Sequence, residues 1–233
     1  MTTTLLIPVL NEIDGLRVTM PLINRGWVDQ ILFVDGGSTD GSLEYIKENG
    51  YEYVEQKKKG MRFAYYEALP YVKGEVIITF SPDGNSVPAC ILTCLEYLTL
   101  TKADMVIVSR YLDWARSYDD DILTGFGNRV FTFLINLLHG GKYTDAMVIF
   151  RAYRKSLISE LDLDKDTAFS LPERIFNTRV SFEPLLSIRA ARKKKKVYEI
   201  PGSEPRRIGG KRKLQVFKWG AVFLWQTIAE IFS

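Results

Sequence analysis

The chain has 233 residues, of which 46% are hydrophobic and 25% charged, and its formal net charge is +3. This length and composition fit one large folded domain, and they exclude a repeat or low-complexity protein. Two cysteines and a single histidine exclude a disulfide framework and a histidine-rich metal site.

Short apolar strands alternate with possible helices over residues 1–110. Such alternation is typical of an α/β fold with a mostly parallel sheet and helices on both faces. The predicted strands are Thr3–Val9, Gln30–Asp35, Tyr51–Glu55, Val76–Phe80 and Met105–Ser109. The segments between them are long enough for helices, which we place at Leu16–Ile23, Leu43–Asn49, Arg62–Leu69 and Pro88–Thr99.

The pattern changes after Arg110, where a polar loop precedes a long helix with one apolar stripe. We place that helix at Leu123–Leu138. A strand, a helix, a second strand and a final apolar helix follow, at Asp145–Arg151, Phe182–Arg192, Val197–Ile200 and Leu214–Phe232.

Polar clusters follow four of the predicted strands in residues 1–110, and they are Asn11–Glu12, Asp35–Gly37, Asp83–Asn85 and Ser109–Arg110. In parallel sheets ligands bind beyond the carboxyl ends of the strands. Such residues also form ordinary turns, but four clusters in succession favour a binding site. The sequence contains neither the G-x-G-x-x-G nor the G-x-x-x-x-G-K-[ST] pattern, so dinucleotide and P-loop sites lack support.

Three of these clusters contain carboxylates, which suit a nucleoside diphosphate and its cation. Glu12 and Asp35 can accept hydrogen bonds from a base or ribose. Asp83 and Asn85 can offer two oxygens to a hard cation such as Mg²⁺ or Mn²⁺. The sequence therefore predicts a donor site at this edge of the sheet.

A series of segments resembles the family 2 glycosyltransferases, which have the GT-A fold. These segments are IPVLNE, VDGGSTDGS, SPDGN, VSRY, GNRVFTFLINLL, TDAMVIFRAYRK and EIPGSEPRRIGGKRKL. The last four are most similar to the polyprenol-phosphate sugar synthases, such as dolichol-phosphate mannose synthase. The resemblance implies one GT-A catalytic domain over residues 1–213, with a nucleotide-sugar-binding half at 1–110 and an acceptor half at 111–213.

The resemblance also implies roles for individual residues. The residues matched to nucleotide-sugar binding are Pro8, Asn11, Glu12, Asp35, Gly37, Gly60 and Arg62. Those matched to the metal are Asp83 and Asn85, and the catalytic set is Asp83, Arg110, Arg129 and Asp145. Those matched to the acceptor phosphate are Arg110, Arg129, Arg151, Glu183, Arg207 and Lys213.

One position departs from the family pattern. Ser81 stands where the first aspartate of the Asp-x-Asp metal motif is expected. A neutral hydroxyl is a weaker ligand, so we expect metal affinity to fall or to depend more on the donor diphosphate. Magnesium often keeps several waters and relies on substrate phosphates, so activity need not be lost.

The expected mechanism depends on the acceptor. A lipid monophosphate has a second pKa near ~6 and is largely ionised at neutral pH, so it needs no general base. Arg110, Arg129 and Arg207 could position it, since arginine forks match phosphate oxygens. In-line attack would invert the anomeric carbon, with the metal stabilising the leaving diphosphate. A hydroxyl acceptor would need a base, for which Asp145 is the candidate.

The C-terminal helix, residues 214–233, is apolar on most of its surface and follows the basic residues Lys211–Lys213. Such a helix either packs on the domain or lies in a membrane interface. We therefore predict a metal-dependent, inverting hexosyltransferase that transfers sugar from a UDP- or GDP-linked donor to a polyprenyl phosphate. We expect it to be cytoplasmic and peripheral on the cytoplasmic face of a membrane.

Two alternatives remain open at this level. The acceptor could be a hydroxyl of a growing glycan, or the chain could bind nucleotide sugars without catalysis. Nucleic acid is not an expected partner, because the basic residues follow a folded α/β site and match no known reader motif.

Overall fold

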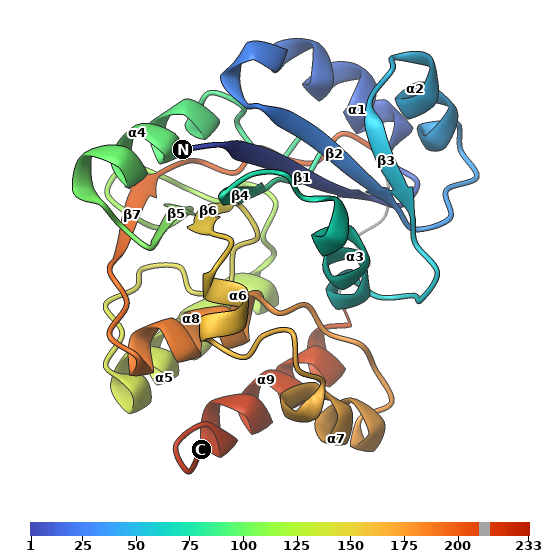
Figure 1. Ribbon diagram of the computed structural model, residues 1–233. Helices are drawn as coiled ribbons and strands as arrows, with labels where there is room; N and C mark the ends of the chain where they lie inside the picture. The colour runs from blue at the N-terminus through green and yellow to red at the C-terminus, as the bar shows by residue number, and fades with distance from the viewer. Residues whose placement is uncertain (210–214) are drawn as a thin grey trace.

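A seven-stranded sheet forms the centre of the computed structural model, which describes residues 1–209 and 215–233 (Figure 1). The strands are β1 (Thr3–Val9), β2 (Gln30–Asp35), β3 (Glu52–Glu55), β4 (Val76–Thr79), β5 (Met105–Ser109), β6 (Arg151–Arg154) and β7 (Val197–Pro201). Their order is β3-β2-β1-β4-β6-β5-β7. The pairings of β6 are antiparallel and the others are parallel, so the predicted α/β fold with a mostly parallel sheet is confirmed.

Helices cover both faces of the sheet. Figure 1 shows α1 (Ile13–Thr19) and α2 (Ser42–Glu48) above it, and α3 (Met61–Ala68) and α5 (Ile122–His139) below it. Helix α4 (Cys90–Thr101) packs on β5 and β6. The other helices lie below the sheet, and they are α6 (Leu157–Glu160), α7 (Thr167–Ile175), α8 (Glu183–Arg192) and α9 (Val216–Ala229). Because it is covered on both faces, the sheet's centre is buried.

Most predicted elements are found within a few residues of their expected bounds. The first predicted helix begins earlier, at Ile13, and continues into a short 3₁₀ turn at Met20–Leu22. Similar turns occur at Arg25–Trp27 and Leu69–Tyr71. Helices α6 and α7 were not predicted.

The predicted strand at Asp145–Arg151 is wrong, because β6 begins only at Arg151. Side chains take the backbone N–H groups that a strand would use for its ladder. Glu199 accepts hydrogen bonds from the N–H groups of Thr144 at 2.7 Å and Asp145 at 2.9 Å. Thr132 accepts one from the N–H of residue 146 at 3.2 Å. These long-range contacts fix a loop where local composition favours a strand.

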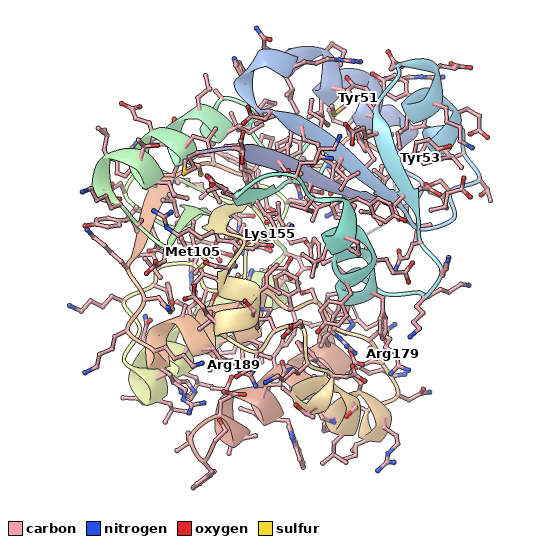
Figure 2. The ribbon with its side chains drawn as sticks, in the orientation of Figure 1. Tyr51, Tyr53, Met105, Lys155, Arg179 and Arg189 are labelled. Atoms are coloured by element: carbon pink, nitrogen blue, oxygen red, sulfur yellow. The ribbon has the colours of Figure 1, made fainter. Side chains whose placement is uncertain are left out.

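Helix α9 packs against α5, α7 and α8. Its side chains Val222 and Phe223 are buried, and Glu230, just after the helix, forms ion pairs with Arg189 at 2.6 Å and Arg192 at 2.5 Å. Figure 2 shows Arg189 on α8, next to α9. The described part of the C-terminal helix is therefore integrated in the domain rather than attached to its surface.

The outward side of α9 is apolar. Phe217 is 82% exposed and Trp225 is 40% exposed, while the polar Gln226 and Thr227 are buried against the domain. Thr227 also receives a contact from α5, since its carbonyl oxygen lies 2.8 Å from His139 Nε2. The helix therefore faces the domain with part of its polar side and leaves large apolar side chains outside.

Candidate active site

A cavity of about 1310 Å³ opens beyond the carboxyl ends of β1, β2, β4 and β5. Parallel strands end at the same edge of a sheet, so the segments that follow them meet there. Pro8, Gly37, Asp83 and Arg110 come from four different strands or the loops after them, and all line the cavity. The structure thus brings the strand-end clusters together, and we take this cavity as the candidate active site.

Two of the predicted nucleotide-binding residues shape the cavity without lining it. Asp35 is buried, and its Oδ2 accepts a hydrogen bond from the N–H of Gly37 at 2.9 Å. Asn11 accepts one from the backbone of the same turn at 2.8 Å. Gly37 has a φ of +91°, a conformation that favours glycine. Asp35 and Asn11 therefore hold a turn, while Pro8, Glu12 and Gly37 contribute to the wall.

Arg62 borders the cavity, but its guanidinium is already neutralised. It is 1% exposed, and it pairs with Glu173 at 2.6 Å and with Asp166. It also lies over the ring of Phe169, 4.3 Å from the centroid. These contacts tie α3 to α7, and the part of Arg62 in nucleotide-sugar binding stays a prediction. Gly60, just before α3, also lines the cavity.

Asp83 lies at the bottom of a tight loop after β4. It is 6% exposed, and its Oδ1 accepts a hydrogen bond from the N–H of Asn85 at 3.3 Å. Gly84 has a φ of +85°, and a Cβ on it would lie 2.6 Å from Ile208, so glycine is required there. Arg207 Nη1 lies 3.6 Å from Asp83 Oδ2. The structure thus places Arg207 beside the predicted metal ligand.

The oxygens of this loop fit an incomplete site for a hard cation. Ser81, Asp83 and Asn85 all line the cavity and carry oxygen donors, which Mg²⁺ and Mn²⁺ prefer. Within residues 1–209 and 215–233, no group of three His, Cys, Asp or Glu side chains could hold a metal by itself. A cation here would need further ligands from a substrate phosphate or water.

Arg110 is held by acidic side chains on several sides. Its Nε and Nη2 donate to the two carboxylate oxygens of Asp145 at 2.6 and 3.0 Å. Its Nη1 donates to Glu204 at 3.3 Å and lies 3.8 Å from Asp120. Burial alone would lower the pKa of Arg110, but Asp145 and Glu204 raise it well above its usual value. Arg110 therefore stays positively charged in the cavity wall.

Asp145, the predicted general base for a hydroxyl acceptor, lies behind Arg110. It is fully buried, it does not line the cavity, and both of its oxygens accept hydrogen bonds from Arg110. Asp145 therefore positions Arg110 in this structure, and its role as a general base stays a prediction. The sequence could not show this, because Arg110 and Asp145 are 35 residues apart.

Glu204 is a cavity residue that the prediction missed, although it lies in the motif GSEPRR. It accepts hydrogen bonds from Arg110, from Asn85 Nδ2 at 3.3 Å and from Ser117. Burial raises its pKa above the usual value despite the neighbouring Arg110. Glu204 thus connects the predicted metal loop to the predicted phosphate-binding arginine.

The remaining predicted acceptor residues divide into three groups. Arg151 and Glu183 are fully buried and do not line the cavity: Arg151 donates to the carbonyl of Val148 at 3.0 Å, and Glu183 accepts from Tyr65 at 2.6 Å. Both side chains therefore lie in the core, and their contact with the acceptor stays a prediction. Arg129 is exposed on α5, with its guanidinium 5.9 Å from the ring of Tyr111. Lys213 lies outside the described residues.

Apolar side chains of α5 and α9 also line the cavity. They include Leu123 and Phe131 from α5, and Trp219 and Phe223 from α9. Phe131 and Phe223 are in edge-to-face contact, with ring centroids 6.1 Å apart. The cavity therefore combines charged side chains at the strand ends with apolar side chains of α5 and α9.

Comparison with known proteins is consistent with this geometry. The family model for glycosyl transferase family 2 matches residues 4–162. Glycosyltransferase AglJ of Haloferax volcanii is 26% identical over 163 residues, which span 70% of this chain and only about half, 53%, of that protein. Undecaprenyl-phosphate mannosyltransferase of Micrococcus luteus is 24% identical over 241 residues, with 95% of each chain covered.

Solved structures show the same fold. Glucosyl-3-phosphoglycerate synthase from Mycobacterium tuberculosis, crystallised with Mn²⁺, UDP and phosphoglyceric acid, superposes with a TM-score of 0.64. The identity is 16%, and the match covers 99% of this chain and 78% of that one. This likeness confirms the predicted GT-A fold.

Proposed function

The chain belongs to glycosyl transferase family 2, and from this premise we propose that it transfers a hexose from a nucleotide sugar to a polyprenyl phosphate. The observation that carries the proposal is the composition of the cavity. A charged arginine lies in its wall near the strand ends, and apolar side chains of α5 and α9 line it as well. A phosphate attached to a long hydrocarbon chain matches both parts. The undecaprenyl-phosphate mannosyltransferase of Micrococcus luteus supports the same acceptor class.

The donor would bind between β1, β2 and the Asp83 loop. Pro8, Glu12, Gly37 and Gly60 would contact the UDP- or GDP-linked sugar, on turns held by Asn11 and Asp35. Asp83 and Asn85 would hold Mg²⁺ or Mn²⁺ together with the donor diphosphate, and this cation would neutralise charge on the leaving group. The solved relative crystallised with Mn²⁺ and UDP supports this type of donor site.

The acceptor phosphate would bind at Arg110, which Asp145 fixes in orientation. A phosphate oxygen attacks the anomeric carbon, the bond from that carbon to the donor diphosphate breaks, and the anomeric configuration inverts. The acceptor is already ionised, so no proton has to be removed. This agrees with the burial of Asp145 behind Arg110, which leaves a hydroxyl acceptor without its predicted base. Arg129, Arg207 and Lys213 remain candidates for additional contacts with the phosphate.

Incubation with labelled UDP- and GDP-hexoses and undecaprenyl phosphate tests the proposal. We expect the label to enter the organic phase as a lipid-linked sugar with one of these donors. Label in a polymer would instead identify a hydroxyl acceptor, and label on phosphoglycerate would identify a small phosphorylated acceptor. Nucleotide binding without transfer to any acceptor would identify a non-catalytic binding protein.

We further propose that the enzyme contacts the cytoplasmic face of a membrane through the outward sides of α5 and α9. None of the helices in the described ranges has the length and hydropathy to cross a bilayer. Phe126 and Phe133 on α5 are 65% and 61% exposed, and Phe217 and Trp225 on α9 are also outside. Lys218 is exposed on α9 and could contact anionic lipid.

Replacement of three outward side chains tests the membrane contact without removing the buried side of α9. The variant Phe217→Ser/Trp225→Ser/Phe232→Ser is expected to bind anionic liposomes at least about tenfold more weakly, since each lost aromatic forfeits ~1.5–3 kcal/mol of burial. Sedimentation with liposomes at low and high salt measures this, and high salt should weaken wild-type binding. Leu100→Ser on α4, 74% exposed in the native chain, is the matched control. If the triple variant binds liposomes as strongly as the wild type, α9 does not take part in the membrane contact.

A further inference from the structure

Arg207 lies against the carboxylate that the proposed function assigns to the divalent cation. Its Nη1 lies 3.6 Å from Asp83 Oδ2, and its Nη2 lies 2.7 Å from Asp119 Oδ2. Asp83 is 6% exposed, and a buried carboxylate is costly unless a positive charge compensates it. Arg207 supplies that charge in the structure.

The main chain around Arg207 is fixed to the Asp83 loop. The N–H of Ile208 donates to the carbonyl of Asp83 at 2.6 Å, and Ile208 packs on Gly84 so closely that a Cβ would lie 2.6 Å away. Before Arg207 in the chain, Glu204 accepts a hydrogen bond from Asn85 at 3.3 Å. Because the segment is attached on both sides, the guanidinium stays close to Asp83 in the donor-free protein.

A divalent cation on Asp83 would stand beside this guanidinium. Like charges a few ångströms apart repel strongly in a partly buried site. The loop cannot offset this repulsion with a second carboxylate, because Ser81 is neutral. Asp119, however, already binds the other edge of the guanidinium, with Nε at 3.1 Å and Nη2 at 2.7 Å from its Oδ2. Arg207 therefore keeps a partner if it leaves Asp83.

We propose that Arg207 and the donor-bound divalent cation compete for Asp83. Arg207 neutralises this carboxylate while the donor is absent, and the arriving cation displaces the guanidinium toward Asp119. The inference rests on the proposed function, which brings a nucleotide diphosphate and its cation to this loop. The competition predicts that the native enzyme binds the cation more weakly than an enzyme in which no guanidinium pairs with Asp83.

The dissociation constant of Mn²⁺ in the presence of saturating UDP, and separately of GDP, tests this competition. Electron paramagnetic resonance of free Mn²⁺ measures it without reference to turnover. Arg207→Gln is expected to tighten Mn²⁺ binding at least about tenfold, because it removes a charge within a few ångströms. Arg206→Gln removes an equal charge from the exposed neighbouring residue and should change the constant less than about twofold.

A second variant covers the case in which Arg207→Gln folds poorly. Arg207→Lys retains the charge but replaces the planar fork with one ammonium group, so it can pair with Asp119 and release Asp83. An intermediate tightening of Mn²⁺ binding supports the competition. Unchanged binding in both variants overturns it, as does an equal effect of Arg206→Gln. Tighter Mn²⁺ binding in an enzyme that labels no lipid would refute the proposed acceptor and leave the competition standing.

Discussion

Asp83→Ala is expected to lower the rate of sugar transfer by at least about 100-fold. The proposed role of Asp83 is to hold the cation that stabilises the leaving diphosphate, which is worth several kcal/mol, and each ~1.4 kcal/mol is tenfold in rate. Steady-state transfer to undecaprenyl phosphate measures the effect, and an excess of chelator should reproduce it in the wild type. Ser81→Asp restores the first aspartate of the Asp-x-Asp motif, so the loop would again carry two carboxylates. This variant should depend more strongly on the metal.

The control is Glu44→Ala, which removes an exposed carboxylate on α2 that does not line the cavity. It should leave transfer unchanged. The Asp83 loop also accepts a hydrogen bond from the N–H of Ile208, so the substitution could disturb the fold. Circular dichroism of Asp83→Ala checks that the variant is folded before its rate is compared. Full activity of Asp83→Ala in excess chelator would exclude the metal from the mechanism.

Arg110→Ala is expected to lower the free energy of unfolding by ~3–5 kcal/mol, because it leaves the fully buried Asp145 without its positive partner. Urea denaturation measures this loss. The double variant Arg110→Ala/Asp145→Ala removes both charges and should be more stable than the sum of the single effects predicts. Transfer should stay low in both variants, since neither retains the guanidinium for the acceptor phosphate.

Arg129→Ala is the matched control for the comparison of the Arg110 and Asp145 variants. Arg129 is exposed on α5, so its loss should change the free energy of unfolding by no more than ~0.5 kcal/mol. If the changes in the free energy of unfolding caused by Arg110→Ala and Asp145→Ala simply add in the double variant, the two side chains do not form the assigned ion pair. Recovery of transfer in the double variant would show that Arg110 does not contact the acceptor.

The strands of residues 1–110 and the location of the cavity follow from features that are local in the sequence. Runs such as Gln30–Asp35 and Met105–Ser109 are apolar and β-branched over the length of one strand, and the structure gives both with the predicted bounds. The polar residues directly after such strands then have to meet at one edge of a parallel sheet. This is why Glu12, Gly37, Asp83 and Arg110 could be assigned to one site from the sequence.

The state of each charged side chain was decided only by tertiary structure. Arg110, Arg129 and Arg151 look alike in the sequence, yet one lines the cavity, one is exposed and one is buried in the core. The same applies to Asp145, which is buried behind Arg110 and does not line the cavity. Local pattern fixes where a residue lies along an element, but not which distant residues cover it.

Sequence separation explains the remaining differences. Arg110 binds Glu204 across 94 positions, and Arg207 binds Asp119 across 88. Periodicity and residue preference extend over one element and carry no information about such pairs. Helix α9 illustrates the difference between local and long-range information. Its helical spacing was visible in the sequence, but the side that it turns toward the domain was not. The ion pairs of Glu230 with Arg189 and Arg192, formed only in the folded chain, help turn the polar side inward and leave Phe217 and Trp225 outside.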